Sequence, residues 1–225
     1  MALDIPVDPR IGAYLFDMDG TLVETERLWS KALVELLRDD GHDLSEDAAY
    51  RIVCGRSWNS IYQDTVTLFP DEAQYDIDAQ ADRLKPYYVR VREGADLRIP
   101  GAAETFLALA KHTPCAIVSG SRREDVEETA DMLGIRDSLA LIIGAQDCPV
   151  GKPAPDGFLM AAKTLGVEPS RCVVFEDSNA GVRSGKAADM RVVALTVPNG
   201  IDQHVRDIAD LCVENLADFR PAALF

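Results

Sequence analysis

The chain has 225 residues, and its 23 Lys and Arg side chains against 38 Asp and Glu side chains give it a net charge of −15. Such an acidic surface repels the phosphates of nucleic acids and of anionic lipids, so we expect neither nucleic acid nor membrane as a partner. The hydrophobic share of 47%, with 15 Gly and 12 Pro, excludes collagen-like, coiled-coil and disordered chains.

The N-terminal part of the chain predicts a strand followed by a block of helices. Residues 13–16 form an apolar run that ends at Asp17, as expected of a buried strand that opens into a loop. From Glu26 to Gly94 apolar residues recur at helical spacing, which predicts four helices. Their predicted boundaries are Gly41 at the end of the first, Ser45 at the start of the second, Pro70 at the end of the third and a capping box of Asp71 and Gln74 at the start of the fourth.

After Gly94 strands and helices alternate. A capping box at residues 121–124 predicts the start of a helix that ends at Gly134. Parallel strands joined by helical crossovers are the economical arrangement, so we predict an α/β fold with a doubly wound parallel sheet, formed by residues 1–23 and 95–225 and interrupted by a helical insert at 24–94. The predicted strands of this second part are 115–118, 139–143, 172–175 and 192–197.

Two further features concern location and redox state. Residues 1–10 lack the pattern of a secretion signal and no apolar run is long enough for a membrane span, so we expect a cytoplasmic protein. The cysteines are widely spaced and form no C-x-x-C pair, which disfavours a disulfide framework or a zinc site. We expect buried free thiols at Cys54, Cys115, Cys148, Cys172 and Cys212.

The segment DMDGT at residues 17–21 is the sharpest chemical feature of the sequence. Asp17 and Asp19 lie two positions apart on an extended segment, so their carboxylates face the same side and repel each other unless a cation or a proton is shared. The alternative is a solvated turn, since Asp and Gly favour turns. The buried strand before Asp17 favours a functional site.

Small residues follow the second predicted strand. Ser119, Gly120 and Ser121 lead directly into the predicted helix, and the N–H groups at a helix N-terminus bind anions. Ser119 is thus a candidate ligand for a phosphate oxygen. The alternative is that Ser121 is an ordinary helix N-cap.

Charged residues follow the next two predicted strands. Lys152 stands in a loop restricted by Pro153 and Pro155, where a fixed ammonium suits a site crowded with anions; the alternative is an ordinary surface lysine. Glu176 and Asp177 place two more carboxylates at a strand end. Four acidic groups at neighbouring strand ends call for a divalent cation, and oxygen-only ligands indicate Mg²⁺.

A glycine-rich segment and the three histidines are not assigned a function. Residues 181–187 resemble a Walker A loop, but they have three residues between the glycines where that motif needs four. Ala187 also stands at the position where the motif needs Ser or Thr to bind the metal. The three histidines, His42, His112 and His204, lie outside the strand-end loops and are interpreted as surface residues.

The four elements, in this order, resemble the motifs of the haloacid dehalogenase-like (HAD) hydrolase superfamily. Asp17 to Thr21 is similar to the first motif, Ser119 to the second, Lys152 to the third and Glu176-Asp177 to the fourth. The insert resembles the helical cap of the β-phosphoglucomutase-like and sugar-phosphatase branch. The resemblance implies a Rossmann-like catalytic core with an inserted four-helix cap domain.

The resemblance also implies the chemistry. Asp17 would be the nucleophile that forms an aspartyl-phosphate, and Asp19 the general acid and then the general base, with Thr21 orienting Asp19. Because dehalogenases and phosphonatases lack the second carboxylate of the first motif, Asp19 favours phosphate-ester hydrolysis.

The resemblance further implies the ligands. Lys152, with Ser119 and Gly120, would bind the transferring phosphoryl group. Mg²⁺ would be held by the Asp17 side chain, the Asp19 main-chain carbonyl and Asp177, with Glu176 in the outer shell. Gly55 and Arg56, in a loop that resembles the specificity loop of the branch, are candidates for contacting the distal part of the substrate.

The expected function is a Mg²⁺-dependent phosphatase, monomeric or weakly dimeric, that acts on a small phosphate ester such as a sugar phosphate. The first alternative is a phosphosugar mutase. Mutases of this branch tend to carry a basic residue and an arginine where this sequence has Cys54 and Trp58, which disfavours that reading. A binding protein without turnover is the second alternative, and the complete set of motif residues argues against it.

Overall fold

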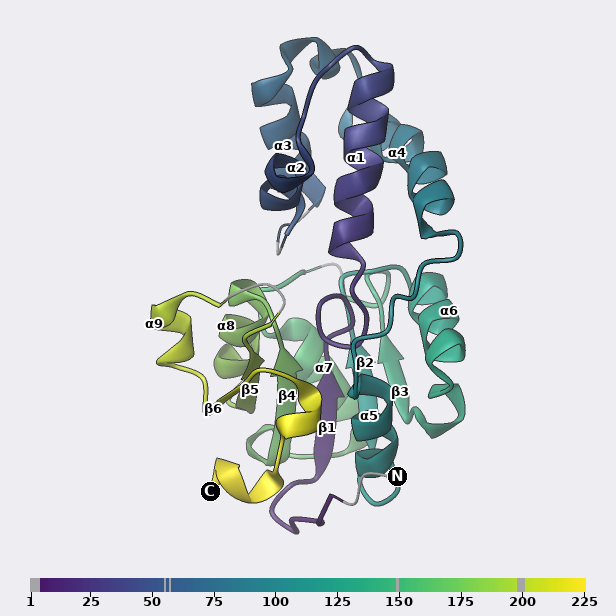
Figure 1. The fold of residues 1–225 in the computed structure, drawn as a ribbon. Helices are drawn as coiled ribbons and strands as arrows, with labels where there is room; N and C mark the ends of the chain where they lie inside the picture. Colours follow the sequence, from purple (N-terminus) through teal and green to yellow (C-terminus); the bar gives the residue numbers. More distant parts are fainter. Residues whose placement is uncertain (1–4, 55, 57, 149, 198–200) are drawn as a thin grey trace. The chain divides into compact units, whose positions relative to one another are not determined.

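The computed structural model describes residues 5–54, 56, 58–148, 150–197 and 201–225. The chain divides into two compact units, one of Met1–Val23 with Arg98–Phe225 and one of Glu24–Leu97. We call them the α/β unit and the helical unit; Figure 1 shows the elements of each. Every helix among the described residues is too short or too polar to cross a lipid bilayer.

Six strands of the described chain form one parallel sheet in the order β3-β2-β1-β4-β5-β6. This confirms the predicted α/β class with a doubly wound parallel sheet. β1 lies in the middle, so the segment that follows it stands between the segments that follow β2 and β4. The strands are β1 (Ala13–Phe16), β2 (Cys115–Val118), β3 (Leu141–Ile143), β4 (Cys172–Glu176), β5 (Arg191–Leu195) and β6 (Leu211–Val213).

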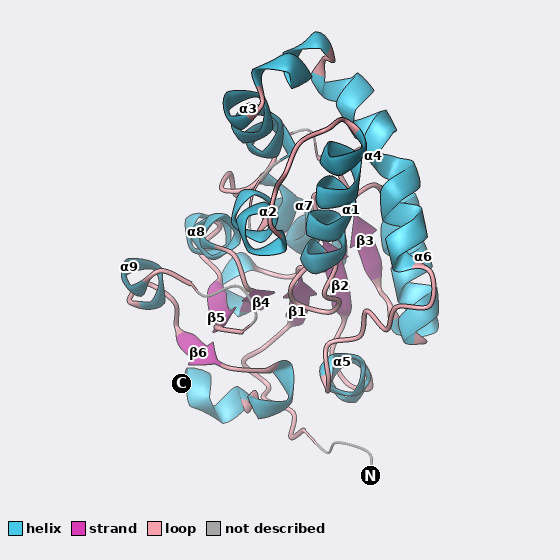
Figure 2. Cartoon of the chain, turned by 45° about the horizontal axis from the view of Figure 1, so that its top comes forward, coloured by secondary structure: helices cyan, strands magenta, loops and turns pink. Residues whose placement is uncertain are grey.

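Helices connect the strands and cover both faces of the sheet. They are α5 (Ala102–Ala110), α6 (Arg123–Leu133), α7 (Asp156–Leu165), α8 (Asn179–Ala187) and α9 (Gln203–Arg206). Because side chains alternate along a strand, Ala13 and Leu15 of β1 join the apolar cluster that contains Phe158 of α7 and Val182 of α8. Figure 2 shows α7 and α8 on one side of the sheet and α5 on the other.

Aromatic rings form the core on the face of α5. Phe16 of β1 stacks on Phe175 of β4 with ring centroids 4.6 Å apart, and Phe106 of α5 lies 4.9 Å from Phe16. All three side chains are fully buried, and burial of each contributes about 2–3 kcal/mol. This packing fixes the carboxyl ends of β1, which Asp17 follows, and of β4, whose last residue is Glu176.

The strand predictions differ from the structure at several places. The strand predicted at 192–197 is β5, which spans Arg191–Leu195, and the strand predicted at 172–175 extends to Glu176. The strand predicted at 139–143 begins only at Leu141, because the chain first forms a 3₁₀ turn at Arg136–Ser138. The sequence pattern does not predict β6, since this strand has three residues at the edge of the sheet and its Cys212 is exposed. A short edge strand carries little hydrophobic signal.

Among its described residues the helical unit has four α-helices, as predicted: α1 (Glu26–Asp39), α2 (Glu46–Val53), α3 (Trp58–Leu68) and α4 (Ile77–Arg92). Its apolar core includes Leu33 and Leu37 of α1, with Leu84 of α4. Trp29 stacks on Tyr88 with centroids 3.7 Å apart. Ser45 caps α2 as predicted, since its side chain accepts a hydrogen bond from Ala48 N.

The predicted start of α4 is wrong. Pro70 to Gln74 form a 3₁₀ helix instead of a capping box, and α4 begins at Ile77 after Asp76, whose Oδ1 accepts from Ala79 N at 2.8 Å. Tyr75 adopts an extended backbone, which separates the two helices.

The histidine and cysteine predictions hold in part. His112 and His204 are exposed, but the imidazole of His42 is half-buried beside the carboxylates of Asp71 and Glu72. All five cysteines are free, as expected, but only two of them are buried. Cys115 and Cys172 are the buried pair, while Cys54 and Cys148 are half-buried.

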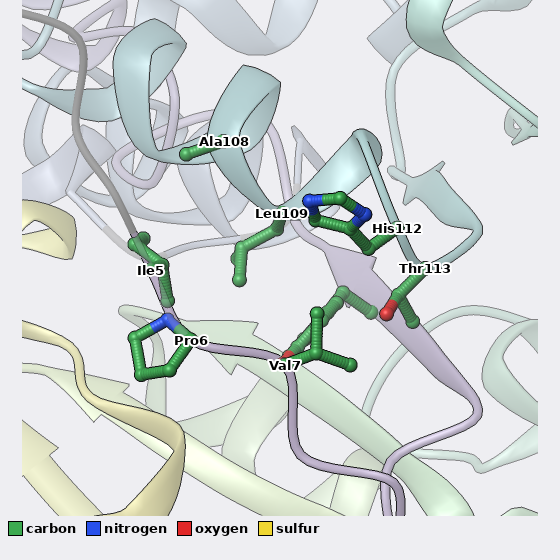
Figure 3. A pocket seen from close by; sticks show the side chains of 8 residues that line it. Ile5, Pro6, Val7, Ala108, Leu109, His112 and Thr113 are labelled. Atoms are coloured by element: carbon green, nitrogen blue, oxygen red, sulfur yellow. The ribbon is translucent and has the colours of Figure 1, made fainter.

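The α/β unit also has a small pocket between its N-terminal segment and α5 (Figure 3). Ile5, Pro6 and Val7 form one side, and Leu109 and His112 lie opposite. Its volume of about 10 Å³ fits about one water molecule. The pocket is therefore too small to hold a metabolite.

Candidate active site

Polar side chains meet at the carboxyl ends of neighbouring parallel strands. Asp17 follows β1, Ser119 follows β2, and Glu176 is the last residue of β4. The register pairs Phe16 of β1 with Phe175 of β4, so Asp17 and Glu176 stand side by side at the same edge. The carboxyl edge of a doubly wound sheet is the usual place for a ligand site.

Lys152, in the loop between β3 and α7, links the two carboxylates. Its Nζ donates to Asp17 Oδ1, lies 2.5 Å from Glu176 Oε1 and donates to the Val118 carbonyl at 3.1 Å. Only 19% of the Lys152 side chain is exposed. Lys152 is therefore held inside the site, in contrast to the surface-lysine alternative.

Glu176 is fully buried, and backbone groups fix its second oxygen. Oε2 accepts from the N–H groups of Asp177 and Ser178 at 3.1 and 3.2 Å and from Ser178 Oγ at 3.0 Å. Gly181 provides the space, because a Cβ at that position would lie 1.8 Å from Glu176 Cδ. Ser178 also caps α8 through Gly181 N. Ser178 and Gly181 are site residues that the sequence reasoning did not assign.

Three carboxylates of the site lie close enough to share a cation. One oxygen each of Asp17, Glu176 and Asp177 falls within 4.8 Å of the others, and all three residues are buried. Lys152 supplies one positive charge against these three acids. A divalent cation would offset the remaining repulsion, and an all-oxygen donor set suits Mg²⁺. The residues present therefore fit the metal that the sequence suggested.

Burial and neighbouring charges shift the pKa values of the central pair. Burial raises the pKa of Asp17; the charge of Lys152 opposes this shift, while those of Glu176 and Asp19 add to it. Burial disfavours the charged form of Lys152, but the carboxylates of Asp17 and Glu176 outweigh burial and raise its pKa. Lys152 is thus a permanent ammonium, suited to contact with a phosphoryl group.

Asp19 and Ser119 are joined by Ser121. The hydroxyl of Ser121 donates to Asp19 Oδ2 at 2.8 Å, and its backbone N–H donates to Ser119 Oγ at 3.0 Å. The predicted capping role of Ser121 is therefore wrong, because α6 begins at Arg123 and Ser121 directs its hydroxyl to Asp19. The predicted end of α6 at Gly134 is confirmed by the left-handed conformation of that glycine.

Thr21 contacts a different carboxylate from the one expected. Its hydroxyl donates to Asp177 Oδ1 at 3.1 Å, and both side chains are buried. The sequence expectation that Thr21 orients Asp19 is replaced by a contact with a candidate metal ligand. The resemblance implied a contact with the near neighbour Asp19, whereas the parallel pairing of β1 and β4 brings Asp177 within reach of Thr21.

The remaining predicted site residues are less constrained. Gly120 is exposed, and a Cβ there would meet no atom within 4 Å, so steric need does not explain this glycine. Arg56 belongs to the helical unit, where it is exposed and lies 2.8 Å from Asp64. Gly55 lies outside the described residues.

Known proteins resemble the chain along most of its length. It is 31% identical over 207 residues to a validoxylamine A 7'-phosphate phosphatase of Streptomyces hygroscopicus subsp. limoneus, covering 92% of this chain and 94% of the relative. It is 32% identical over 184 residues to the fructose-1-phosphate phosphatase YqaB of Escherichia coli K12, covering 82% and 96%.

A solved structure shows the same fold. The HAD family hydrolase of Deinococcus radiodurans R1, with bound phosphate and sodium, superposes with a TM-score of 0.75 at 29% identity, covering 96% of each chain. The family model for haloacid dehalogenase-like hydrolases matches residues 11–189, which include every strand-end residue described above. The chain therefore belongs to the haloacid dehalogenase-like hydrolases.

Proposed function

We propose that this hydrolase is a Mg²⁺-dependent phosphatase that removes the phosphoryl group of a small phosphorylated metabolite, of the sugar-phosphate class, through an aspartyl-phosphate. The observation that carries the proposal is the buried carboxylate of Asp17, which is contacted by Lys152 and flanked by Asp177. A nucleophilic carboxylate, a fixed ammonium and a set of metal-binding oxygens are the parts that phosphoryl transfer needs.

In the first step a carboxylate oxygen of Asp17 attacks the phosphorus. The new bond joins Asp17 to phosphorus, the bond to the ester oxygen breaks, and Asp19 gives that oxygen its proton. In the second step water attacks the phosphorus of the aspartyl-phosphate, Asp19 takes the proton of the water, and the bond to Asp17 breaks. The products of this step are inorganic phosphate, the free Asp17 carboxylate and the protonated Asp19, so both side chains return to their starting states.

Other residues of the chain hold the phosphoryl group during both steps. Lys152 is positioned by Asp17, Glu176 and the Val118 carbonyl, so its positive charge is held beside the Asp17 carboxylate. Ser119 accepts the Ser121 N–H at its oxygen and retains its own hydroxyl proton as a donor for a phosphoryl oxygen. Such preorganised donors stabilise charge that develops in the transition state.

The side chains of Asp17 and Asp177 and the main-chain carbonyl of Asp19 are the proposed Mg²⁺ ligands. When bound, Mg²⁺ supplies positive charge that offsets the acidic cluster and the phosphoryl oxygens. Glu176 is assigned to the outer shell, because Lys152 and two N–H groups already contact its oxygens.

The names of two relatives support the substrate class, since one is a fructose-1-phosphate phosphatase and the other a validoxylamine A 7'-phosphate phosphatase. Arg56 and Gly55 of the helical unit remain our candidates for contacts with the distal part of the substrate. The ion pair of Arg56 with Asp64 at 2.8 Å is exposed, so this pair costs little to break.

Phosphate release tests the proposal. Sugar phosphates, polyol phosphates, nucleotides and 4-nitrophenyl phosphate are offered to the wild type, to Asp17→Asn and to the control Asp8→Asn, with Mg²⁺ or with a chelator. Asp8 pairs with Arg10 before β1, away from the strand ends. We expect release that requires both Mg²⁺ and Asp17 and persists in the control.

Two outcomes would overturn the proposal. Full activity of Asp17→Asn would exclude the aspartyl-phosphate. Phosphosugar isomerisation that depends on an added bisphosphate and exceeds phosphate release would identify a mutase instead.

A further inference from the structure

We infer that Ser121 is a positioning residue for Asp19, and that its hydroxyl holds the Asp19 carboxylate in the orientation that proton transfer requires. The contact joins the loop after β1 to the loop after β2, and the two residues are 102 positions apart in the sequence. Ser121 Oγ donates to Asp19 Oδ2 at 2.8 Å, and both side chains are half-buried. The inference rests on the proposed function, which gives Asp19 the proton-transfer role.

Backbone contacts fix the position of Ser121 itself. Its N–H donates to Ser119 Oγ at 3.0 Å, and its carbonyl accepts from Ala145 N at 2.9 Å. The first contact lies within the loop after β2, and the second ties Ser121 to the segment after β3. These contacts fix the backbone from which the Ser121 hydroxyl extends towards Asp19.

The backbone of Asp19 is fixed in a comparable way. Gly20 takes a φ of 82°, which favours glycine, and its N–H donates to the Val23 carbonyl at 2.7 Å. What remains adjustable is the rotation of the Asp19 carboxylate about its side-chain bonds. The Ser121 hydroxyl selects one of these orientations.

The single hydroxyl proton of Ser121 also distinguishes the two oxygens of Asp19. Because Oδ2 accepts this proton, the contact sets the direction in which the carboxylate plane of Asp19 lies. A carboxylate that presents the wrong oxygen, or rotates between orientations, spends less time in a reactive geometry. Ser121 therefore contributes to the rate of proton transfer without contacting the substrate phosphorus.

A role in helix capping does not account for the contact. The N-cap position of α6 is occupied by Arg122, and the first N–H group of the helix, that of Arg123, donates to Gln146 Oε1 at 2.9 Å. Loss of the Ser121 hydroxyl should therefore leave α6 intact.

Leaving-group dependence separates a positioning role from a structural one. An alkyl phosphate needs a proton on its leaving oxygen, whereas 4-nitrophenyl phosphate releases a stable anion without one. kcat/KM reports the steps up to formation of the aspartyl-phosphate. We expect Ser121→Ala to lower kcat/KM for the alkyl ester on the order of 10-fold, and for the aryl ester much less.

The same variant should lower kcat for both esters, since hydrolysis of the aspartyl-phosphate uses Asp19 in each case. Ser121→Thr keeps a hydroxyl and should restore most of the alkyl-ester activity. Asp19→Asn should show the same leaving-group pattern with a larger loss. The matched control is Ser170→Ala, which removes an exposed hydroxyl of the α/β unit, and the melting temperatures of all variants accompany the kinetics.

The outcomes distinguish this inference from the proposed function. If Ser121→Ala loses kcat/KM equally for the two esters, or loses none, the positioning role of Ser121 is overturned. The phosphatase proposal still stands in that case, provided that the wild type is active and Asp19→Asn is impaired. If the wild type releases no phosphate from either ester in Mg²⁺, both fail together.

Discussion

The two units bury acidic side chains in opposite ways. At the strand ends of the α/β unit, Asp17, Glu176 and Asp177 lie within 4.8 Å of one another, with Lys152 as their cationic partner. In the helical unit, buried Glu72 faces Arg83 Nη1 at 3.1 Å, and its other oxygen lies 3.4 Å from the imidazole of His42.

The difference lies in the ratio of acids to bases. The groups that contact the Glu72 oxygens are donors, including Gln80 Nε2 at 3.5 Å. The further acids beside Arg83 and His42, which are Asp40 and Asp71, are exposed to solvent, so the buried carboxylate itself is compensated by the protein. Around Asp17 three acids share one ammonium, and the fold is left with repulsion that burial makes worse. A compensated buried charge indicates a structural role, whereas an excess of one sign indicates a site that is completed by a ligand.

The largest expected effect is the loss of phosphate release in a variant of Asp17. Asp17→Asn removes the nucleophile and one of the repelling charges, so we expect phosphate release to fall by at least about 10³-fold while the melting temperature in a chelator stays equal or rises. Phosphate release and thermal unfolding measure the two effects. A marked loss of stability would show that the acidic cluster is structural, which contradicts the comparison.

The counterpart in the helical unit is Arg83→Met. Removing one partner of a buried pair leaves Glu72 uncompensated, and such changes cost about 3–5 kcal/mol. Because 23% of the Arg83 side chain is exposed, we expect a decrease of about 2–3 kcal/mol in the free energy of unfolding, after a reduction for solvent screening.

Tryptophan fluorescence during urea unfolding measures this loss, because both tryptophans, Trp29 and Trp58, belong to the helical unit. The matched control is Arg90→Met on the same helix, whose pair with Glu35 is largely exposed. It should cost less than about 1 kcal/mol. Equal losses in the two variants would mean that burial does not distinguish the two ion pairs.

Much of the fold follows from local pattern. The apolar run before Asp17 predicts the central strand because all four of its residues are apolar and buried, and the helical spacing after Glu26 predicts the four-helix insert because it recurs over many residues. The edge strand β6 and the start of α4 depend on three or four residues each, where turn geometry and edge pairing decide the outcome. Short elements of this kind carry too little periodicity to be predicted.

At the site, the charged residues can be predicted from the sequence and their hydroxyl partners cannot. The side chains that carry charge can be identified from the strand ends, and the structure brings Asp17, Lys152 and Glu176 into contact. The hydroxyl partners could not be assigned, since Thr21 reaches Asp177 and Ser121 reaches Asp19 only through the pairing of strands far apart in the sequence. Contacts between distant segments have no local signature.

A smaller effect is expected at Thr21, which donates to Asp177 Oδ1 at 3.1 Å. Thr21→Val keeps the shape of the side chain and removes the hydroxyl, so Asp177 loses a group that orients it. We expect the Mg²⁺ concentration for half-maximal activity to rise about 3–10-fold, the equivalent of one hydrogen bond, with the rate at saturating Mg²⁺ little changed.

The rise of the melting temperature with added Mg²⁺ gives a second measurement that does not depend on turnover. Thr21→Ser serves as the control, because it retains the hydroxyl. An unchanged Mg²⁺ requirement in Thr21→Val would show that the acidic cluster binds its cation without help from this hydroxyl.

The smallest expected effect is on stability at alkaline pH, through Cys172. This residue is the first of β4, and Glu176 is the last. Here burial acts without an excess of charge: it raises the pKa of the Cys172 thiol to about 11, with Arg171 opposing weakly. An unfolded thiol loses its proton near pH 8.5, so between about pH 8.5 and 11 the unfolded chain is deprotonated while the folded chain keeps the proton. The stabilisation from this group is therefore complete below pH 8.5 and is lost as the pH rises towards 11.

Urea titration at a series of pH values measures the free energy of unfolding. We expect it to fall more steeply between about pH 8.5 and 11 in the wild type than in Cys172→Ala. Phosphatase activity at neutral pH should be the same in both. Parallel curves would show that burial at this end of β4 does not perturb the thiol, and the contrast with the acidic end would then rest on charge alone.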